Sequence, residues 1–141
     1  MNEPANHHPV AARVLVCEDQ PEQATLLAEW LEQQRVQVTL AKGPDYAADA
    51  LAHMHAAYAA NAPFHLILAD LRLGQESGLG VSLVRAVKAG FRATHIVLCS
   101  GDANLLSDAI SVAGYAGVLL KPFNSSEIRR MLIMHRLPVP D

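Results

Sequence analysis

Long apolar runs are missing from this sequence of 141 residues, and its N-terminus has no basic segment followed by an apolar stretch. The first absence excludes a membrane-spanning helix and the second argues against a secretory signal, so we expect a cytoplasmic protein. We also expect a single domain, because 141 residues, 51% of them hydrophobic, suffice for one sizeable core but not comfortably for two.

Cysteine and positive charge are also scarce. The two cysteines, Cys17 and Cys99, lie inside apolar runs without Cys-x-x-Cys or Cys/His spacing, which favours reduced core thiols over a metal site. The net charge of −3 provides no electrostatic surface for nucleic acid. Any effect on nucleic acid is therefore expected to need a protein partner.

Short apolar runs alternate along the chain with stretches of helical spacing. This pattern predicts strands at residues 10–17, 36–40, 66–69, 95–99 and 118–120, and helices at residues 21–34, 45–60, 81–88, 103–113 and 124–136. The strand at 36–40 alternates apolar with polar residues and is expected at a sheet edge. Strict alternation predicts an α/β fold with right-handed crossovers and a parallel sheet covered by helices on both faces. The domain is expected at residues 10–137, with tails at 1–9 and 138–141.

Polar side chains stand where four of the predicted strands end. They are Glu18, Asp19, Asp70, Ser100 and Lys121. Because the carboxyl ends of parallel strands share one edge, where open α/β sheets form their ligand crevice, we expect these groups to converge. Taken alone, Asp70 would more simply cap the turn that follows its strand. The functional interpretation depends on the set of five.

Three neighbouring carboxylates repel one another, and burial adds to the cost, so the cluster calls for a cation. Oxygen ligands of this kind suit Mg²⁺, which takes one or two carboxylates together with phosphate oxygens and water. A nucleophilic aspartate such as Asp70 can accept a phosphoryl group. Lys121 would then supply positive charge and Ser100 a hydroxyl donor to that group.

In these residues the chain resembles the receiver domain of two-component response regulators, over residues 11–136. The matching residues are Glu18-Asp19, Asp70, Ser100-Gly101 and Lys121-Pro122-Phe123. The resemblance implies a flavodoxin-like (βα)5 three-layer sandwich with parallel strand order 2-1-3-4-5, and a Lys121–Pro122 bond that is often cis. Among receiver domains, the chain most resembles the free-standing response regulators of the chemotaxis type.

The resemblance also implies a role for each site residue. Asp70 would be the phosphoacceptor, supplied by a sensor histidine kinase or a histidine phosphotransfer protein, and Ser100 and Lys121 would contact the phosphoryl oxygens. Asp19 and Asp70 would bind Mg²⁺ directly, Glu18 would bind it through water, and the backbone carbonyl of Arg72 would complete the set. The protein would be a signalling phosphoacceptor rather than an enzyme, acting on an unknown downstream protein.

Two features bear on how such a receiver would signal. Receivers usually carry Tyr or Phe three residues before the lysine, whereas this chain has Val118, and the nearby Tyr115 falls in the preceding turn. We therefore expect an unusual output or none. Arg72 and Asp102 could pair across the site entrance and modulate hydrolysis of the aspartyl phosphate, but two solvated loop charges are an equal alternative.

Other functions are open at this stage. A phosphatase of the haloacid-dehalogenase type would need an acid where Arg72 stands, and a flavodoxin would need a phosphate-binding loop where Glu18 and Asp19 place negative charge. A pseudo-receiver, folded alike but used only as an interaction module, is the more serious alternative. The few residues after 136 cannot form an effector domain, so output would act through another protein, as a phosphate sink, or within a longer polypeptide.

Overall fold

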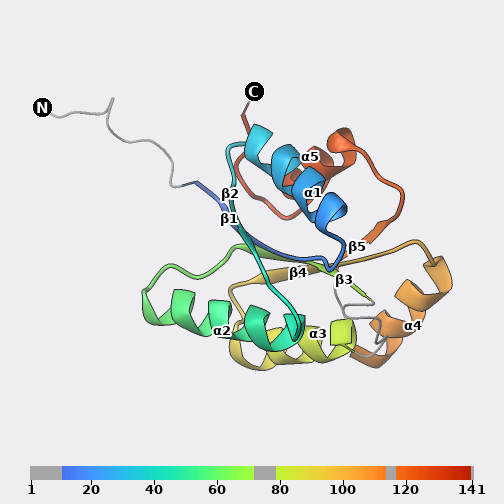
Figure 1. Ribbon diagram of the computed structural model, residues 1–141, viewed down its shortest axis with the longest axis horizontal. Helices are drawn as coiled ribbons and strands as arrows, with labels where there is room; N and C mark the ends of the chain where they lie inside the picture. Colours follow the sequence, from blue (N-terminus) through green and yellow to red (C-terminus); the bar gives the residue numbers. More distant parts are fainter. Residues whose placement is uncertain (1–10, 72–78, 114–116, 141) are drawn as a thin grey trace, which may run out of the picture.

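The computed structural model describes residues 11–71, 79–113 and 117–140, and shows strands and helices in strict alternation (Figure 1). The strands are β1 (Arg13–Cys17), β2 (Gln37–Leu40), β3 (Leu66–Asp70), β4 (His95–Ser100) and β5 (Gly117–Leu120). The helices are α1 (Pro21–Gln33), α2 (Tyr46–Ala59), α3 (Leu79–Gly90), α4 (Ala103–Ala113) and α5 (Ser125–Met134). None of the described helices is long and apolar enough to cross a bilayer.

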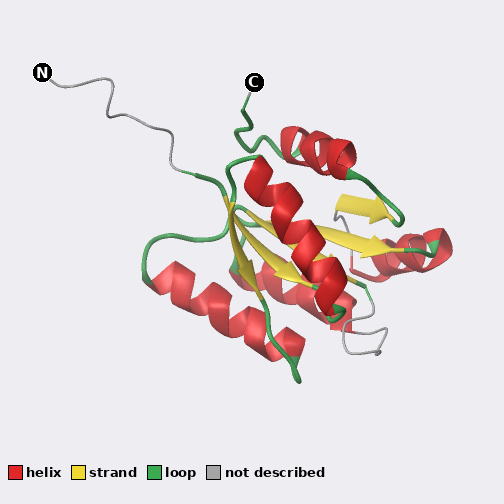
Figure 2. Cartoon of the chain, turned by 45° about the horizontal axis from the view of Figure 1, so that its top comes forward, coloured by secondary structure: helices red, strands yellow, loops and turns green. Residues whose placement is uncertain are grey.

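The strands form one parallel sheet in the order β2-β1-β3-β4-β5. Helices α1 and α5 cover one face and α2, α3 and α4 the other, so the fold is the three-layer sandwich predicted from the sequence (Figures 1 and 2). β2 lies at an edge, as its polar alternation indicated. The carboxyl ends of β1 and β3 meet at the centre of the sheet, where the strand order reverses.

Each face of the sheet has its own apolar core. Leu66 and Leu68 of β3 belong to the core beneath α1 and α5, whereas Ile67 and Ala69 belong to the core on the opposite face. Because both faces are covered, β3 shows none of the polar alternation of a half-exposed strand. This strand therefore holds Asp70 on a rigid, fully packed support.

Side chains cap two of the helices as the sequence indicated. Asp45 accepts a hydrogen bond from the backbone N–H of Ala48 at the start of α2. Asn124 and Glu127 form a reciprocal capping box at the start of α5. The Lys121–Pro122 bond is cis, as the resemblance implied, and Gly43–Pro44 is also cis.

Some predicted helix ends were wrong by about two residues. α3 begins at Leu79 and continues to Gly90, beyond the predicted 81–88. α5 ends at Met134 rather than 136, because Arg136 takes a left-handed backbone conformation with φ of 62° that no helix continues. Residues 1–9, Arg72 and Tyr115, about which the sequence supports expectations, lie outside the described residues.

The cysteines agree with this strand order. Cys17 lies on β1 and Cys99 on β4, with β3 between them, and both are free and buried. Burial raises the pKa of Cys17 to about 12 and also raises the pKa of Cys99. Both thiols are therefore protonated packing groups at neutral pH.

Adjacent positions on α5 provide a test of how the helix is oriented. Leu132 is fully buried, whereas 51% of Ile133 is exposed. We expect Leu132→Ala to lower the free energy of unfolding by about 2–5 kcal/mol through cavity formation. Ile133→Ala should change it by about 0.5 kcal/mol or less. Urea denaturation followed by circular dichroism measures both, and equal losses would contradict the placement of α5.

Candidate functional site

The predicted convergence of polar side chains is confirmed at the carboxyl edge of the sheet. A cavity of about 730 Å³ opens there, lined among others by Asp19, Asp70, Ser100, Asp102 and Lys121. These residues lie at or just after the ends of four different strands, so residues as far apart in sequence as Asp19 and Lys121 share one site.

Three carboxylates lie side by side in this site. Glu18, Asp19 and Asp70 each offer one oxygen atom, and these atoms all lie within 4.8 Å of one another. Glu18 is buried, with 5% of its surface exposed, and its Oε2 accepts a hydrogen bond of 3.2 Å from the backbone N–H of Gln20. Burial raises the pKa of Glu18, although its hydrogen bond with Lys121 opposes the rise. The ionised cluster therefore depends on positive charge close by.

Lys121 supplies that charge within the protein. Its Nζ lies 2.7 Å from Asp70 Oδ2 and 2.9 Å from Glu18 Oε1, and it also donates to Gln23 Oε1 at 3.0 Å. Burial alone would lower the pKa of Lys121, but the hydrogen bonds to Asp70 and Glu18 outweigh it and raise the pKa. The amine is therefore charged and bridges two of the three carboxylates.

Ser100 closes the site from the side of β4. It is 7% exposed, and its Oγ accepts a hydrogen bond of 3.1 Å from the backbone N–H of Asp102. Ser100 also lines the cavity. Asp102 Oδ1 accepts from the backbone N–H groups of Asn104 and Leu105 and thereby caps the start of α4. The proposed pairing of Asp102 with Arg72 involves a residue outside the described ranges and stays a prediction.

Sequence reasoning missed Gln23 as part of the site. Its side-chain amide accepts from Lys121 and donates to Gln20 Oε1 at 2.9 Å, so it links the amine to the loop that carries the acids. The position of Gln23 in the sequence could have indicated this role. It lies in the first turn of the helix that follows Glu18 and Asp19, and that turn lies at the same edge of the sheet as the two acids. The amine of Lys121 thus has a neutral third acceptor.

The role of Gln23 can be tested by a double-mutant cycle. We expect Gln23→Leu to lower the free energy of unfolding by about 0.5–1 kcal/mol, because one charge-assisted but solvent-exposed hydrogen bond is lost. In a Lys121→Met background the same change should cost less, because only the hydrogen bond from Gln23 to Gln20 is then lost. Gln33→Leu, at an exposed position near the other end of α1, is the control. Costs that simply add would show that Gln23 does not act on Lys121.

The one tryptophan of the sequence reports on this region. Trp30 on α1 is partly buried, and its ring centroid lies 6.3 Å from that of Phe123, two residues after Lys121. The sequence suggested partly buried packing for Trp30, and the structure confirms it. Changes around Lys121 can therefore be followed through tryptophan fluorescence.

The acidic cluster fits a small hard cation. Two oxygen atoms bound directly to Mg²⁺ at ~2.1 Å lie at most ~4.2 Å apart, and the 4.8 Å within which the three carboxylate oxygens lie is close to that limit. Glu18, the most buried of the three, can complete the arrangement through water. The donor set consists of carboxylate oxygens only, with neither thiolate nor imidazole, which suits Mg²⁺ rather than zinc or copper.

A parallel sheet of this strand order, with an acidic cluster at its switch point, defines the flavodoxin-like class of α/β domains. The chain belongs to the response regulator receiver domain family, whose family model matches residues 14–133. Receiver domains are signalling proteins rather than classical enzymes. No curated protein sequence matches the chain.

Solved structures share the fold. Chemotaxis response regulator CheY4 of Vibrio cholerae is 23% identical over 89% of this chain and 98% of its own, with a TM-score of 0.71. A signal receiver domain from Bermanella marisrubri is 22% identical over 90% of this chain and 98% of its own, with a TM-score of 0.67. NtrX from Brucella abortus is 26% identical over 90% of this chain, with a TM-score of 0.69, but the match spans 26% of that longer chain.

Proposed function

We propose that this receiver accepts a phosphoryl group on Asp70 from the phosphohistidine of a kinase or phosphotransfer protein, and slowly hydrolyses the product. The observation that carries the proposal is the contact of 2.7 Å between Lys121 Nζ and Asp70 Oδ2 beside two further carboxylates. An Asp70 oxygen forms a bond to phosphorus while the phosphorus–nitrogen bond breaks, and its electron pair returns to the donor imidazole.

The surrounding residues orient and neutralise the incoming group. Asp19 and Asp70 would hold Mg²⁺ directly, Glu18 would hold it through water, and the carbonyl of Arg72 would complete the protein ligands. The ion would neutralise charge on a phosphoryl oxygen. Lys121 is within reach of the same group and would contact a second oxygen, while the Ser100 hydroxyl would donate to a third.

The chain as a whole would act as a cytoplasmic signalling domain at residues 10–137, with tails at 1–9 and 138–141. Its output would pass to an unknown protein partner by surface contacts. Val118, at the position that is usually aromatic, is 48% exposed on β5. A valine has no aromatic ring that could turn inward on phosphorylation. The signal would therefore reach the partner by another route than the movement of a ring at position 118, whether the domain acts alone or within a longer polypeptide.

Acetyl phosphate provides the direct test. The full chain is incubated with this small donor with Mg²⁺ or with EDTA, and phosphoryl incorporation is read by intact mass. We expect incorporation with Mg²⁺ and none with EDTA, together with a saturable change in Trp30 fluorescence when Mg²⁺ is added. Absence of incorporation in both conditions, with the protein folded, would favour the pseudo-receiver that acts only as an interaction module.

A further inference from the structure

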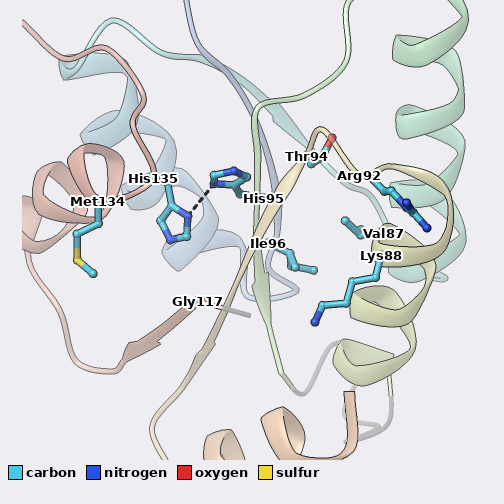
Figure 3. A pocket seen from close by; sticks show the side chains of 9 residues that line it. All are labelled: Val87, Lys88, Arg92, Thr94, His95, Ile96, Gly117, Met134 and His135. Carbon is cyan, nitrogen blue, oxygen red and sulfur yellow. Dashed lines mark hydrogen bonds between the residues drawn. The ribbon is translucent and has the colours of Figure 1, made fainter. Parts of the chain in front are cut away.

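A second cavity lies at the opposite end of the sheet from the acidic site, where the strands begin and the helices end. It has a volume of about 410 Å³ and lies between the end of α3, the start of β4 and the end of α5 (Figure 3). Binding sites for small molecules have volumes of about 300–1,000 Å³, so this cavity is large enough for a small metabolite. Val87, Ile96 and Met134 give it an apolar part.

The charged side chains that line this cavity are positive. Lys88 stands in the last turn of α3, and Arg92 lies between α3 and β4. Both residues are exposed, and neither side chain forms an ion pair with another described residue. In Figure 3 the Lys88 side chain extends from α3 toward the sheet. No carboxylate is among the described residues of the lining, so the two cations are available to an anion in the cavity.

The helices that end beside the cavity oppose this positive charge only weakly. Unsatisfied carbonyl groups in the last turn of a helix carry partial negative charge, which would repel an anion. In α5 the carbonyl groups of residues 131–133 accept hydrogen bonds from the backbone N–H groups of His135, Arg136 and Leu137. At the end of α3, Lys88 itself offsets the negative end of the helix dipole. The positive side chains therefore determine the sign of the potential in the cavity.

Two histidines from distant parts of the chain meet at one side of the cavity. His95 begins β4 and His135 directly follows α5, and their Nδ1 atoms lie 3.0 Å apart. One Nδ1 donates and the other accepts, so the contact can hold with both rings neutral or with one proton added to the pair, but not with two. A Cβ atom at Gly117 would lie 2.8 Å from His135 Nε2, so the His135 ring packs directly on the backbone at the start of β5. The pair is therefore fixed by the fold and can add one positive charge to the cavity.

The surroundings of this pair disfavour that added proton until an anion is present. Burial, together with the neighbouring His95, lowers the pKa of His135. The titratable and charged groups described around the pair are Lys88 and Arg92 in the cavity, Glu127 and Arg130 of α5, and Arg13 and His65 beside the start of β4. Positive groups outnumber negative ones among them, so a bound dianion would favour uptake of the proton.

We propose that this cavity binds a small phosphate monoester, at a site separate from the acidic edge of the sheet. The two negative charges of the ester match Lys88 and Arg92, and the planar guanidinium of Arg92 can donate two parallel hydrogen bonds to phosphate oxygens. Lys88 contacts the phosphate as a compact point charge. The organic part of the ester packs on the apolar lining. Because the dianion favours a proton on the imidazole pair, the site binds more tightly as the pH falls.

NMR titration of the full chain tests the proposal with three probes, in EDTA and at about pH 8, where a phosphate group carries two charges. Phenyl phosphate has a ring and two charges, benzoate has a ring and one charge, and inorganic phosphate has two charges and no ring. We expect phenyl phosphate to shift the resonances of Arg92, His95 and His135 until they saturate. The other two probes should bind at least about tenfold more weakly, since each lacks one of the interactions. Equal binding of inorganic phosphate would rule out the ester in favour of the free ion, and equal binding of benzoate would rule out a phosphate site.

Two substitutions that each remove one positive charge give an independent test. Lys88→Met and Arg92→Met change exposed residues, so both variants should fold, and each should weaken phenyl phosphate binding about tenfold. Lys42→Met and Arg35→Met remove exposed positive charges elsewhere and are the matched controls. Unchanged affinity in the first two variants would overturn the proposal. Resonance shifts confined to Trp30 and its surroundings would overturn it as well, because the anion would then lie in the acidic site.

Sulfate isolates the contribution of the imidazole pair, because it keeps two negative charges across the range in which histidine titrates, about pH 5–8. Followed at the Arg92 resonance, sulfate should bind the unaltered chain about threefold more tightly at the lower end of this range. His135→Gln should lose this pH dependence, whereas the control His53→Gln, on α2, should keep it. A pH dependence that persists in His135→Gln would overturn the role of the pair.

Discussion

Replacing Asp70 by asparagine is expected to abolish phosphoryl incorporation from acetyl phosphate. Asp70 is the carboxylate in contact with both the Lys121 amine and the acidic cluster, and an amide is a poor nucleophile. We expect a loss of at least about 100-fold, since removal of the nucleophile costs a covalent enzyme much more than this. Intact mass spectrometry after incubation with acetyl phosphate and Mg²⁺ measures the effect.

The Asp70→Asn change preserves size and an oxygen acceptor for Lys121, so the variant should fold. Asp108→Asn, on the exposed surface of α4, is the matched control and should be phosphorylated like the unaltered chain. Incorporation that persists in Asp70→Asn would identify a different acceptor and contradict the assigned role. In that case the neighbouring carboxylate of Asp19 is the next residue to replace.

Lys121→Met is expected to destabilise the metal-free protein by about 3 kcal/mol. The substitution keeps a long apolar side chain but leaves Glu18, with 2% of its side chain exposed, facing Asp70 without a counter-charge. Breaking a buried ion pair by removing one partner costs about 3–5 kcal/mol, and the partial exposure of Lys121 places this case at the lower end. Urea denaturation in EDTA measures the free energy of unfolding.

Mg²⁺ distinguishes this explanation from a simple packing defect. A divalent ion can replace the missing positive charge, so Mg²⁺ should stabilise Lys121→Met by more than it stabilises the unaltered chain. Lys42→Met, at an exposed position outside the acidic cluster, should behave like the unaltered chain under both conditions. Equal stabilisation of Lys121→Met and the unaltered chain by Mg²⁺ would show that Lys121 does not serve as the counter-ion of the cluster.

The order of elements was predictable because each depends on local patterns. The uninterrupted apolar run before Asp70 identified a strand buried on both faces, and Asn124 with Glu127 marked the start of a helix. Helix ends were less predictable. The left-handed backbone conformation of Arg136 prevents α5 from continuing, and an arginine gives no indication of such a conformation in the sequence. α3 includes Gly90 as its last residue, although glycine usually ends a helix before its own position.

The members of the acidic site were predictable for a topological reason. In a parallel sheet every carboxyl strand end lies at one edge, so Glu18, Asp70 and Lys121 could be assigned to one site before any distance was known. The hydrogen bonds of that site were not predictable. Gln23 occupies an ordinary helical position, and only the packing of α1 against the sheet places its amide 3.0 Å from the Lys121 amine.

By itself, the amino-acid sequence determined the class of fold and the chemistry of the acidic edge, because periodicity and strand-end residues are local properties of the chain. Only the tertiary structure decided which side chains touch. His95 and His135 carry no shared motif, and they meet because β4 begins where α5 ends and Gly117 leaves room for a ring. Contacts of this kind depend on the relative placement of separate elements, which no local pattern in the sequence encodes.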